Sequence, residues 1–337
     1  MVVIKVALSA VFNIHYKGFI YREVDEVLEK LNRFLRKVYD YGFKASIFIS
    51  GATAEIASRD KELIKIIKDG LRRGDLEVCN CSYSYPILAK LPLNEVKDQI
   101  KRSQEILAEV FGDVSPGFYP PESFFDPLLP LVLSELEFSW ILLNPTACIH
   151  EFGETVPHLP VEILGVHNTR ITGVFTCTKW DDLNHLFLLE ELPPPPRITV
   201  IHLSEEDLFS VGEVDKKLAL LSVLLKHVEA DITLISDYIR ETPASEEVTI
   251  GSPNPLWRLE ILWSEARESI RTLESLAKTK QSLDAYTLLE KAIRHLYFSE
   301  SSSAYFSKNR SPLLELESCE KALEATELAR RALKILS

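Results

Sequence analysis

The chain has 337 residues, with 50 acidic and 38 basic side chains and a formal net charge of −12. This acidic excess argues against a nucleic-acid or anionic-membrane partner, because either partner would require a basic face. No apolar run reaches the roughly 20 residues that a membrane helix needs. The apolar start at residues 1–11 predicts a buried strand rather than a cleaved signal.

The five cysteines are odd in number and irregularly spaced, which is typical of a reducing compartment rather than of a disulfide framework. We therefore expect a cytoplasmic protein. A single methionine among many ionic residues is compatible with a thermophilic source. The acidic surface leaves open whether the chain forms a homo-oligomer.

Over the first 240 or so residues, short apolar runs alternate with stretches of helical periodicity. The predicted strands cover residues 1–11, 45–50, 76–79, 117–119, 139–143, 163–166, 171–175, 198–203 and 231–236. Such alternation predicts a parallel sheet with right-handed crossovers, and seven or eight units predict a closed or nearly closed barrel. We predict an α/β fold, a (β/α)7-type distorted parallel barrel followed by a small C-terminal helical bundle.

The composition changes after Thr242. Residues 243–255 are rich in Pro, Ser and Gly and predict a linker, and residues 256–337 carry three helical patterns. We therefore expect a catalytic-type barrel domain over residues 1–242 and a helical bundle domain over residues 256–337.

Candidate reacting groups follow the carboxyl ends of the predicted strands, where a parallel barrel places its active site. They are His15, Tyr83, Tyr85, Tyr119, Glu122, Trp180, Asp181, Glu205 and Asp207. Aromatic rings stack on the C–H faces of sugars, while carboxylates bind hydroxyl groups and transfer protons. This mixture of side chains predicts a carbohydrate site.

The chain resembles glycoside hydrolase family 57, most closely within residues 45–145, and, more distantly, the polysaccharide deacetylases that share its barrel. The resemblance rests on FNIH (12–15), SYSYPILAKLP (82–92), DQIKRSQEILAEVFG (98–112) and above all GFYPPESFFDP (117–127). In that family a strand-end segment of the form Gly-aromatic-aromatic-Pro-Pro-Glu supplies the catalytic nucleophile. The resemblance therefore implies that Glu122 is the nucleophile of a retaining α-glucan glycosidase or 4-α-glucanotransferase-like enzyme, with no cofactor and no metal.

The resemblance also implies an oligo- or polysaccharide substrate, with His15, Tyr83, Tyr85, Tyr119, Trp180 and Asp181 lining its site. One departure concerns the acid/base aspartate, because Ser204 or Leu203 stands at its position. A serine cannot protonate a leaving oxygen at neutral pH. Glu205 or Asp207 is the provisional acid/base, and an alternative is a non-catalytic member that binds carbohydrate or a protein partner.

A metal-dependent deacetylase is the third alternative. In those enzymes a His-x-x-x-His pattern and a nearby aspartate bind the metal. Here Cys81 and Tyr85 replace the two histidines, and Asn13 and His15 stand at the expected aspartates. His15 and Cys81 alone do not make a three-ligand catalytic site.

Structural roles remain open for some of these groups. His202 lies inside an apolar strand and is predicted to be a core or barrel-lumen histidine. Glu205, Glu206 and Asp207 could cap the N-terminus of a helix, where the helix dipole favours carboxylates. Cys79 and Cys81 are predicted to be structural rather than metal ligands.

Overall fold

The computed structural model describes residues 5–13, 23–145, 159–176, 198–203, 213–227, 230–280, 282–300 and 311–336. Its strands are β1 (Lys5–Phe12), β2 (Ala45–Ile49), β3 (Leu76–Asn80), β4 (Gly117–Phe118), β5 (Trp140–Leu143), β6 (Val161–Leu164), β7 (Arg170–Phe175), β8 (Ile198–Leu203), β9 (Asp231–Ile232) and β10 (Glu247–Thr249). Its α-helices are α1 (Glu23–Asp40), α2 (Gly51–Ala57), α3 (Lys61–Arg73), α4 (Leu93–Phe111), α5 (Leu129–Glu135), α8 (Glu213–His227), α9 (Ile235–Glu241), α10 (Pro255–Lys280), α11 (Leu283–Ser299) and α13 (Pro312–Leu336). Three short 3-10 turns are η2 (Leu88–Lys90), η3 (Pro121–Ser123) and η5 (Val166–Asn168).

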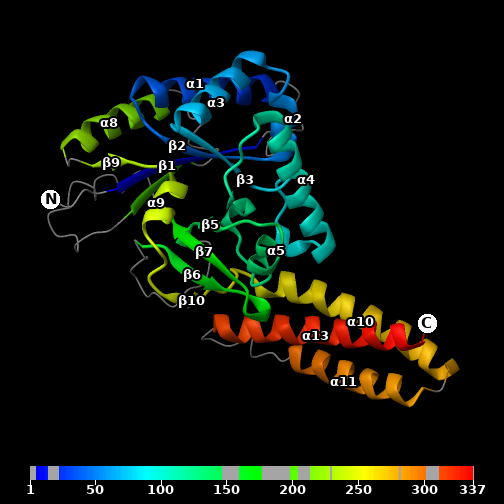
Figure 1. Cartoon of the computed structure of the whole chain (residues 1–337). Helices are drawn as coiled ribbons and strands as arrows, with labels where there is room; N and C mark the ends of the chain where they lie inside the picture. Colours follow the sequence, from blue (N-terminus) through cyan, green and yellow to red (C-terminus); the bar gives the residue numbers. More distant parts are fainter. Residues whose placement is uncertain are drawn as a thin grey trace.

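The strands form one sheet in the order β10-β6-β7-β5-β4-β3-β2-β1-β8, with β9 beside the start of β1 (Figure 1). All of these pairs are parallel except β6 with β7. Thr176, directly after β7, forms a parallel bridge with Val200 of β8. This bridge links the two sides of the sheet and closes a ring of β1, β2, β3, β4, β5, β7 and β8, which confirms the predicted (β/α)7-type distorted barrel.

Residues along the strands alternate between two buried faces, as expected for parallel strands covered on both sides. On β1, for example, Leu8 and Ala10 pack outward in the core cluster that includes residues of α1, α3 and α8, whereas Ala7 and Val11 face the lumen. We call the inner set the lumen cluster, and its buried members are Ala7, Val11, Phe48, Cys79, Cys81, Tyr119, Trp140, Leu142, Val174, Ile198, Val200, Ile235 and Tyr238.

Trp140 is the largest side chain of the lumen cluster, and it lies directly against the backbone of β4. A Cβ atom added to Gly117 would lie 2.1 Å from Cζ2 of Trp140. Only glycine therefore fits at the start of β4 while the indole fills the lumen.

Helix α9 closes the amino end of the barrel over a buried carboxylate. Glu77 accepts hydrogen bonds from the backbone N–H groups of Ile235 (3.0 Å) and Ser236 (3.3 Å). It also accepts hydrogen bonds from the hydroxyl groups of Ser46, Ser115 and Ser236. The predicted strand at 231–236 was wrong beyond Ile232, because Glu77 stabilises a helix start at Ile235.

The predicted strand at 163–166 is the second difference from expectation. The strand β6 ends at Leu164, and η5 turns the chain back so that β6 runs antiparallel to β7. His167 and Asn168 take left-handed φ values of 56° each in this turn. A parallel crossover needs a dozen or more residues, so the short connection permits only a hairpin.

The predicted linker holds structure of its own: its residues 247–249 form β10, which pairs with β6. Beyond it, α10, α11 and α13 pack side by side below the barrel (Figure 1). Their shared core is rich in alanine, including Ala266, Ala292 and Ala325, and small side chains allow close helix approach. The predicted C-terminal helical bundle is therefore confirmed. Within the described ranges, no helix is long and apolar enough to span a membrane.

Candidate functional site

The candidate site lies at the carboxyl ends of the barrel strands, which we call the rim. The turn η3 follows β4 and carries Glu122 there, with its side chain exposed. Glu122 has φ 57° and ψ 20°, and the next residue, Ser123, has φ 55°. Non-glycine residues are rarely left-handed, and such strained residues concentrate at functional sites.

Two hydrogen bonds hold the η3 turn to neighbouring rim segments. The backbone N–H of Glu122 donates to the phenol oxygen of Tyr85 over 3.4 Å. The hydroxyl oxygen of Ser123 accepts the backbone N–H of Asn144, directly after β5, over 2.5 Å. The Glu122 carboxylate is therefore presented from a turn that is tied to the segments on both sides.

Tyr85 comes from the loop after β3, and its ring packs partly against the lumen cluster. This loop is held by Asn80, whose side chain donates to the carbonyl of Ile100 (3.0 Å) and accepts the N–H of Ser82 (2.8 Å). Ser82 and Tyr85 are both left-handed, with φ of 74° and 57°. The structure thus brings two of the predicted site residues, Tyr85 and Glu122, into contact.

Tyr119 lies deeper, in the lumen below the rim, and is only 6% exposed. Its ring centroid is 4.9 Å from that of His202 on β8 and 5.5 Å from that of Phe48. Nδ1 of His202 lies 2.9 Å from the hydroxyl oxygen of Ser9. His202 therefore faces the lumen, as the sequence predicts, and its contact with Tyr119 joins strands from opposite sides of the ring.

Tyr83 is held between two helices. Its hydroxyl donates to Glu55 of α2 over 3.1 Å, and the guanidinium of Arg102 on α4 lies 4.1 Å from its ring centroid. Burial raises the pKa of the Tyr83 phenol, and the hydrogen bond with Glu55 and the charge of Glu55 add to the rise. These contacts join α2 and α4 through Tyr83, which among the described residues forms hydrogen bonds with Glu55 and Arg102.

Five predicted site residues lie outside the described residues: His15, Trp180, Asp181, Glu205 and Asp207. The described part of the chain does include β8, which ends at Leu203, immediately before the segment that holds Ser204, Glu205 and Asp207.

The cysteines predicted to be structural lie in the lumen. Cys79 and Cys81 are both fully buried. Burial, followed by the charge of Glu77, raises the pKa of the Cys79 thiol well above its ordinary value. In the part of the chain that the structure describes, no three His, Cys, Asp or Glu side chains gather as a metal site would require.

Sequence reasoning missed Asp126 and Arg258. The two side chains form a fully buried ion pair, with Nη2 of Arg258 3.1 Å from Oδ2 of Asp126. Asp126 lies in the same GFYPPESFFDP segment as Glu122, so the motif contained a signal for it. Arg258 lies in the first turn of α10, and its sequence context resembles that of any helical arginine.

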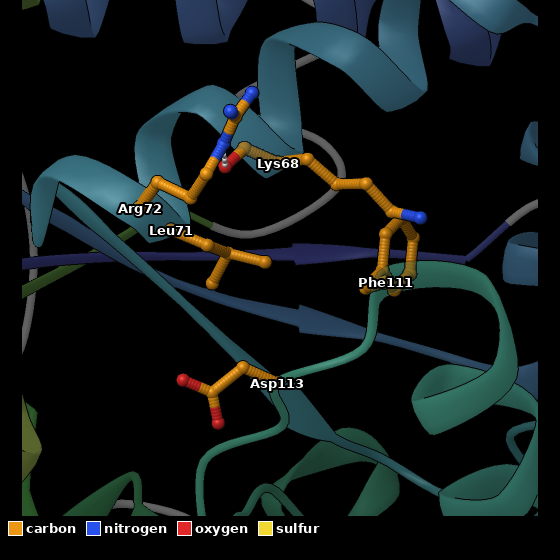
Figure 2. Close-up of a pocket in the computed structure, with 5 residues that line it drawn as sticks. All are labelled: Lys68, Leu71, Arg72, Phe111 and Asp113. Carbon is orange, nitrogen blue, oxygen red and sulfur yellow. Dashed lines mark hydrogen bonds between the residues drawn. The ribbon is translucent and has the colours of Figure 1, made fainter.

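A surface pocket of about 300 Å³ lies elsewhere, between α3 and the end of α4 (Figure 2). Lys68, Leu71, Arg72, Phe111 and Asp113 line it. The lining segments lead into the amino ends of β3 and β4, so the pocket lies at the opposite end of the barrel from the rim. It is not part of the candidate site.

Three comparisons with known proteins agree with this architecture. A 124-residue stretch, 36% of this chain, is 27% identical to an α-amylase from Pyrococcus horikoshii but spans only 19% of that protein. The fold is similar to the 4-α-glucanotransferase of Thermococcus litoralis, with a TM-score of 0.58, 12% identity, and coverage of 98% of this chain and 60% of that chain. It is also similar to a branching enzyme from Thermococcus kodakaraensis, with a TM-score of 0.59, 11% identity, and coverage of 100% and 89%.

The strongest assignment comes from the family comparison. Residues 8–172 match glycosyl hydrolase family 57, a range that begins within β1, ends within β7 and includes the turn with Glu122. Over these residues, just under half of the chain, the sequence is similar to glycosyl hydrolase family 57.

Proposed function

We propose that this protein is a retaining α-glucan-active enzyme in which Glu122 is the nucleophile. The observation that carries the proposal is the placement of Glu122, exposed at the rim on a strained turn that is hydrogen-bonded to Tyr85. Strain of this kind persists only where the surrounding structure enforces it, and it concentrates at active sites. The family match and the PPE segment agree with this role.

The substrate class follows from the relatives. The comparisons include an α-amylase, a 4-α-glucanotransferase and a branching enzyme, and all three names describe chemistry on α-linked glucans. The chain spans about a fifth of the matched amylase and 60% of the glucanotransferase. An α-linked glucan is the proposed substrate class, and hydrolysis and transfer are the two reactions proposed on it.

The proposed chemistry has two steps. The Glu122 carboxylate attacks the anomeric carbon, and the glycosidic C–O bond breaks as a second group donates a proton to the leaving oxygen. Water or another glucan hydroxyl then gives up a proton to that group and displaces the ester, so the configuration is retained. Tyr85 lies beside Glu122 and is proposed to contact the sugar.

The position of β8 supports an acid/base from the following segment. Tyr119 of the β4 end and His202 of β8 meet across the lumen, so the chain leaves β4 and β8 on facing sides of the rim. Retaining chemistry requires two carboxyl groups roughly 5–5.5 Å apart. We propose Glu205 or Asp207 as the partner of Glu122.

The direct test uses α-maltotriosyl fluoride, because fluoride leaves without a proton from an acid. Wild-type protein is expected to release fluoride and to form an ester on Glu122 that mass spectrometry of the denatured protein detects. Glu122→Gln should lose at least about a thousandfold in rate, because an amide cannot form the ester intermediate.

Glu109→Gln is the matched control, since Glu109 is an exposed glutamate on α4 and undergoes the same chemical change. It should retain wild-type fluoride release. Full activity in Glu122→Gln, or an adduct on another residue, would remove Glu122 from the mechanism.

A non-catalytic glucan-binding protein is the second candidate, and Ser204 in place of the acid/base aspartate favours it. Calorimetric titration of the wild-type protein with maltoheptaose, beside an assay for released reducing ends, separates the two. Binding without turnover of either maltoheptaose or the fluoride supports this second candidate, and turnover that depends on Glu122 rejects it.

A further inference from the structure

The first turn of α10 contacts the segment that carries Glu122. Arg258 is 1% exposed and Asp126 0%, and the guanidinium donates to both carboxylate oxygens, over 3.2 Å from Nε and 3.1 Å from Nη2. Two further N–H groups of Arg258 donate to the carbonyls of Leu88 (2.8 Å) and Leu91 (2.7 Å). One side chain of the helical bundle therefore joins two rim segments of the barrel.

The neighbouring residue on α10 repeats this connection. The Trp257 ring stacks on Phe124 with centroids 4.9 Å apart and an interplanar angle of 19°. The ammonium group of Lys90 lies 3.9 Å from the centroid of the Trp257 ring. We call Trp257 and Arg258, together with their partners on residues 88–91 and 124–126, the clamp.

The clamp acts on the two segments that meet at the candidate nucleophile. Asp126 lies four residues after Glu122, and Leu88 lies three residues after Tyr85. Glu122 and Tyr85 are themselves joined by a hydrogen bond. A shift of either segment relative to the other would therefore move the carboxylate relative to Tyr85.

The ion pair of the clamp is better suited to fixing the positions of the two segments than to stabilising the fold. A buried ion pair recovers its desolvation cost only with complete hydrogen bonding, and well-packed apolar side chains often stabilise a fold equally well. Arg258 places four hydrogen bonds in fixed directions, because its guanidinium is planar and rigid. Apolar packing alone would leave more freedom to the two segments.

We propose that Arg258 is a positioning residue that holds the segments of Tyr85 and Glu122 at the separation required for attack on the sugar. The helical bundle is then a working part of the active site rather than an appendage. This inference rests on the proposed function of Glu122, and it assigns to the bundle a role in the rate of the chemical step.

The first experiment follows hydrogen exchange in Arg258→Lys, which keeps a positive charge beside Asp126 but loses the rigid fork. Exchange should become faster in residues 85–92 and 119–126 and stay unchanged in β1, β2 and α13. Arg267→Lys is the matched control, because Arg267 lies on the same helix in an exposed pair with Glu300. Unchanged exchange at both rim segments in a folded Arg258→Lys would overturn the clamp.

The second experiment measures kcat and KM on α-maltotriosyl fluoride. Arg258→Lys should lose at least about tenfold in kcat, because small misplacements of a reacting group are costly. Its KM should stay within about threefold of wild type, since the binding groups remain. Arg267→Lys should match wild type, and equal kcat in both variants would overturn the positioning role.

A paired variant covers the case in which Arg258→Lys does not fold. Asp126→Leu/Arg258→Met replaces both charges by apolar groups and should fold, yet it should show the same loss of kcat because the directed hydrogen bonds are gone. Wild-type kcat in this variant would overturn the proposal. If Glu122→Gln retains full turnover, the proposed function fails, while the exchange experiment still decides the clamp.

Discussion

Glu77 shows how a charged side chain is accommodated inside an apolar barrel. Its carboxylate is buried at the amino end of the lumen and accepts hydrogen bonds from three serine hydroxyls and two backbone N–H groups. Buried charge is tolerated only when it is fully hydrogen-bonded. Glu77 thereby joins β2, the segment before β4 and the start of α9.

Replacement of Glu77 by glutamine tests this account. The NH2 group of the glutamine would face the hydroxyl and N–H groups that donate to Glu77, so some of these buried donors would lose their acceptor. We therefore expect the free energy of unfolding to fall by about 3 kcal/mol. Urea denaturation followed by circular dichroism measures the change. Glu62→Gln, an exposed glutamate paired with Arg36, should change stability by less than about 0.5 kcal/mol. Equal effects of the two substitutions would contradict the role of Glu77.

Some site residues could be predicted from the sequence, whereas the contacts between them could not. Glu122 was identified because the segment GFYPPESFFDP (117–127) resembles the nucleophile segment of glycoside hydrolase family 57. The contact between Tyr85 and Glu122, and the buried pair of Asp126 and Arg258, join residues 37 and 132 positions apart. Contacts between residues so far apart in sequence depend on the topology of the fold. A residue pattern at the end of one strand does not indicate which other segment will lie beside it.

At the scale of elements, α11 and α13 meet through alanine-rich faces and one ion-pair cluster. Nδ1 of His295 and Nζ of Lys321 each lie 2.7 Å from Oε2 of Glu324. Partial burial acts to raise the pKa of Glu324, but the hydrogen bond and charge of Lys321, with His295, outweigh it and lower that pKa.

The lowered pKa makes a prediction about acid stability. A carboxylate with a depressed folded-state pKa contributes stability above its unfolded pKa, and this contribution is lost as the pH falls through the folded value. Glu324→Gln should therefore lower the free energy of unfolding near neutral pH, by less than about 1 kcal/mol because the side chain is 37% exposed. Urea titrations at pH about 7 and about 3 measure it, and a difference that persists at the lower pH would contradict the assignment.

Most strands could be predicted as elements, whereas two connections could not. Runs such as 45–50 and 198–203 are apolar enough to be strands in any parallel barrel, and β2 and β8 confirm them. The start of α9 depends on Glu77, which is about 160 residues away along the chain. The hairpin between β6 and β7 depends on two residues with left-handed φ, His167 and Asn168. Neither residue is glycine, the residue type that usually marks such a position in a sequence.

In the whole molecule, the barrel is closed by the bridge between Thr176 and Val200, and the helical bundle packs against rim segments of the barrel. Leu128 and Val166 of the barrel part enter the core of the bundle, and His167 donates its backbone N–H to Glu320 of α13 over 2.8 Å. Barrel and bundle therefore share a core in addition to the clamp, and a ligand at the rim should stabilise both together.

Glucan binding is expected to raise the melting temperature of the whole chain in one transition. Maltoheptaose at about 100 times its Kd should add about 2.7 kcal/mol. Calorimetry on Glu122→Gln, which should bind without turnover, measures the shift. Cellohexaose, in which the glucose units are β-linked, serves as the control. An equal shift with both sugars, or none with either, would contradict an α-glucan site.

The sequence by itself determined the class of fold, the similarity to glycosyl hydrolase family 57 and the identity of the carboxylate proposed as nucleophile. These depend on hydrophobic periodicity and on short motifs, which are local properties of the chain. Only the tertiary structure decided the closure of the ring through Thr176 and Val200, the burial of Glu77, and the junction of α10 with the segment that carries Glu122. Each of these joins residues far apart in sequence, and their pairing depends on the burial and hydrogen bonding of the complete fold.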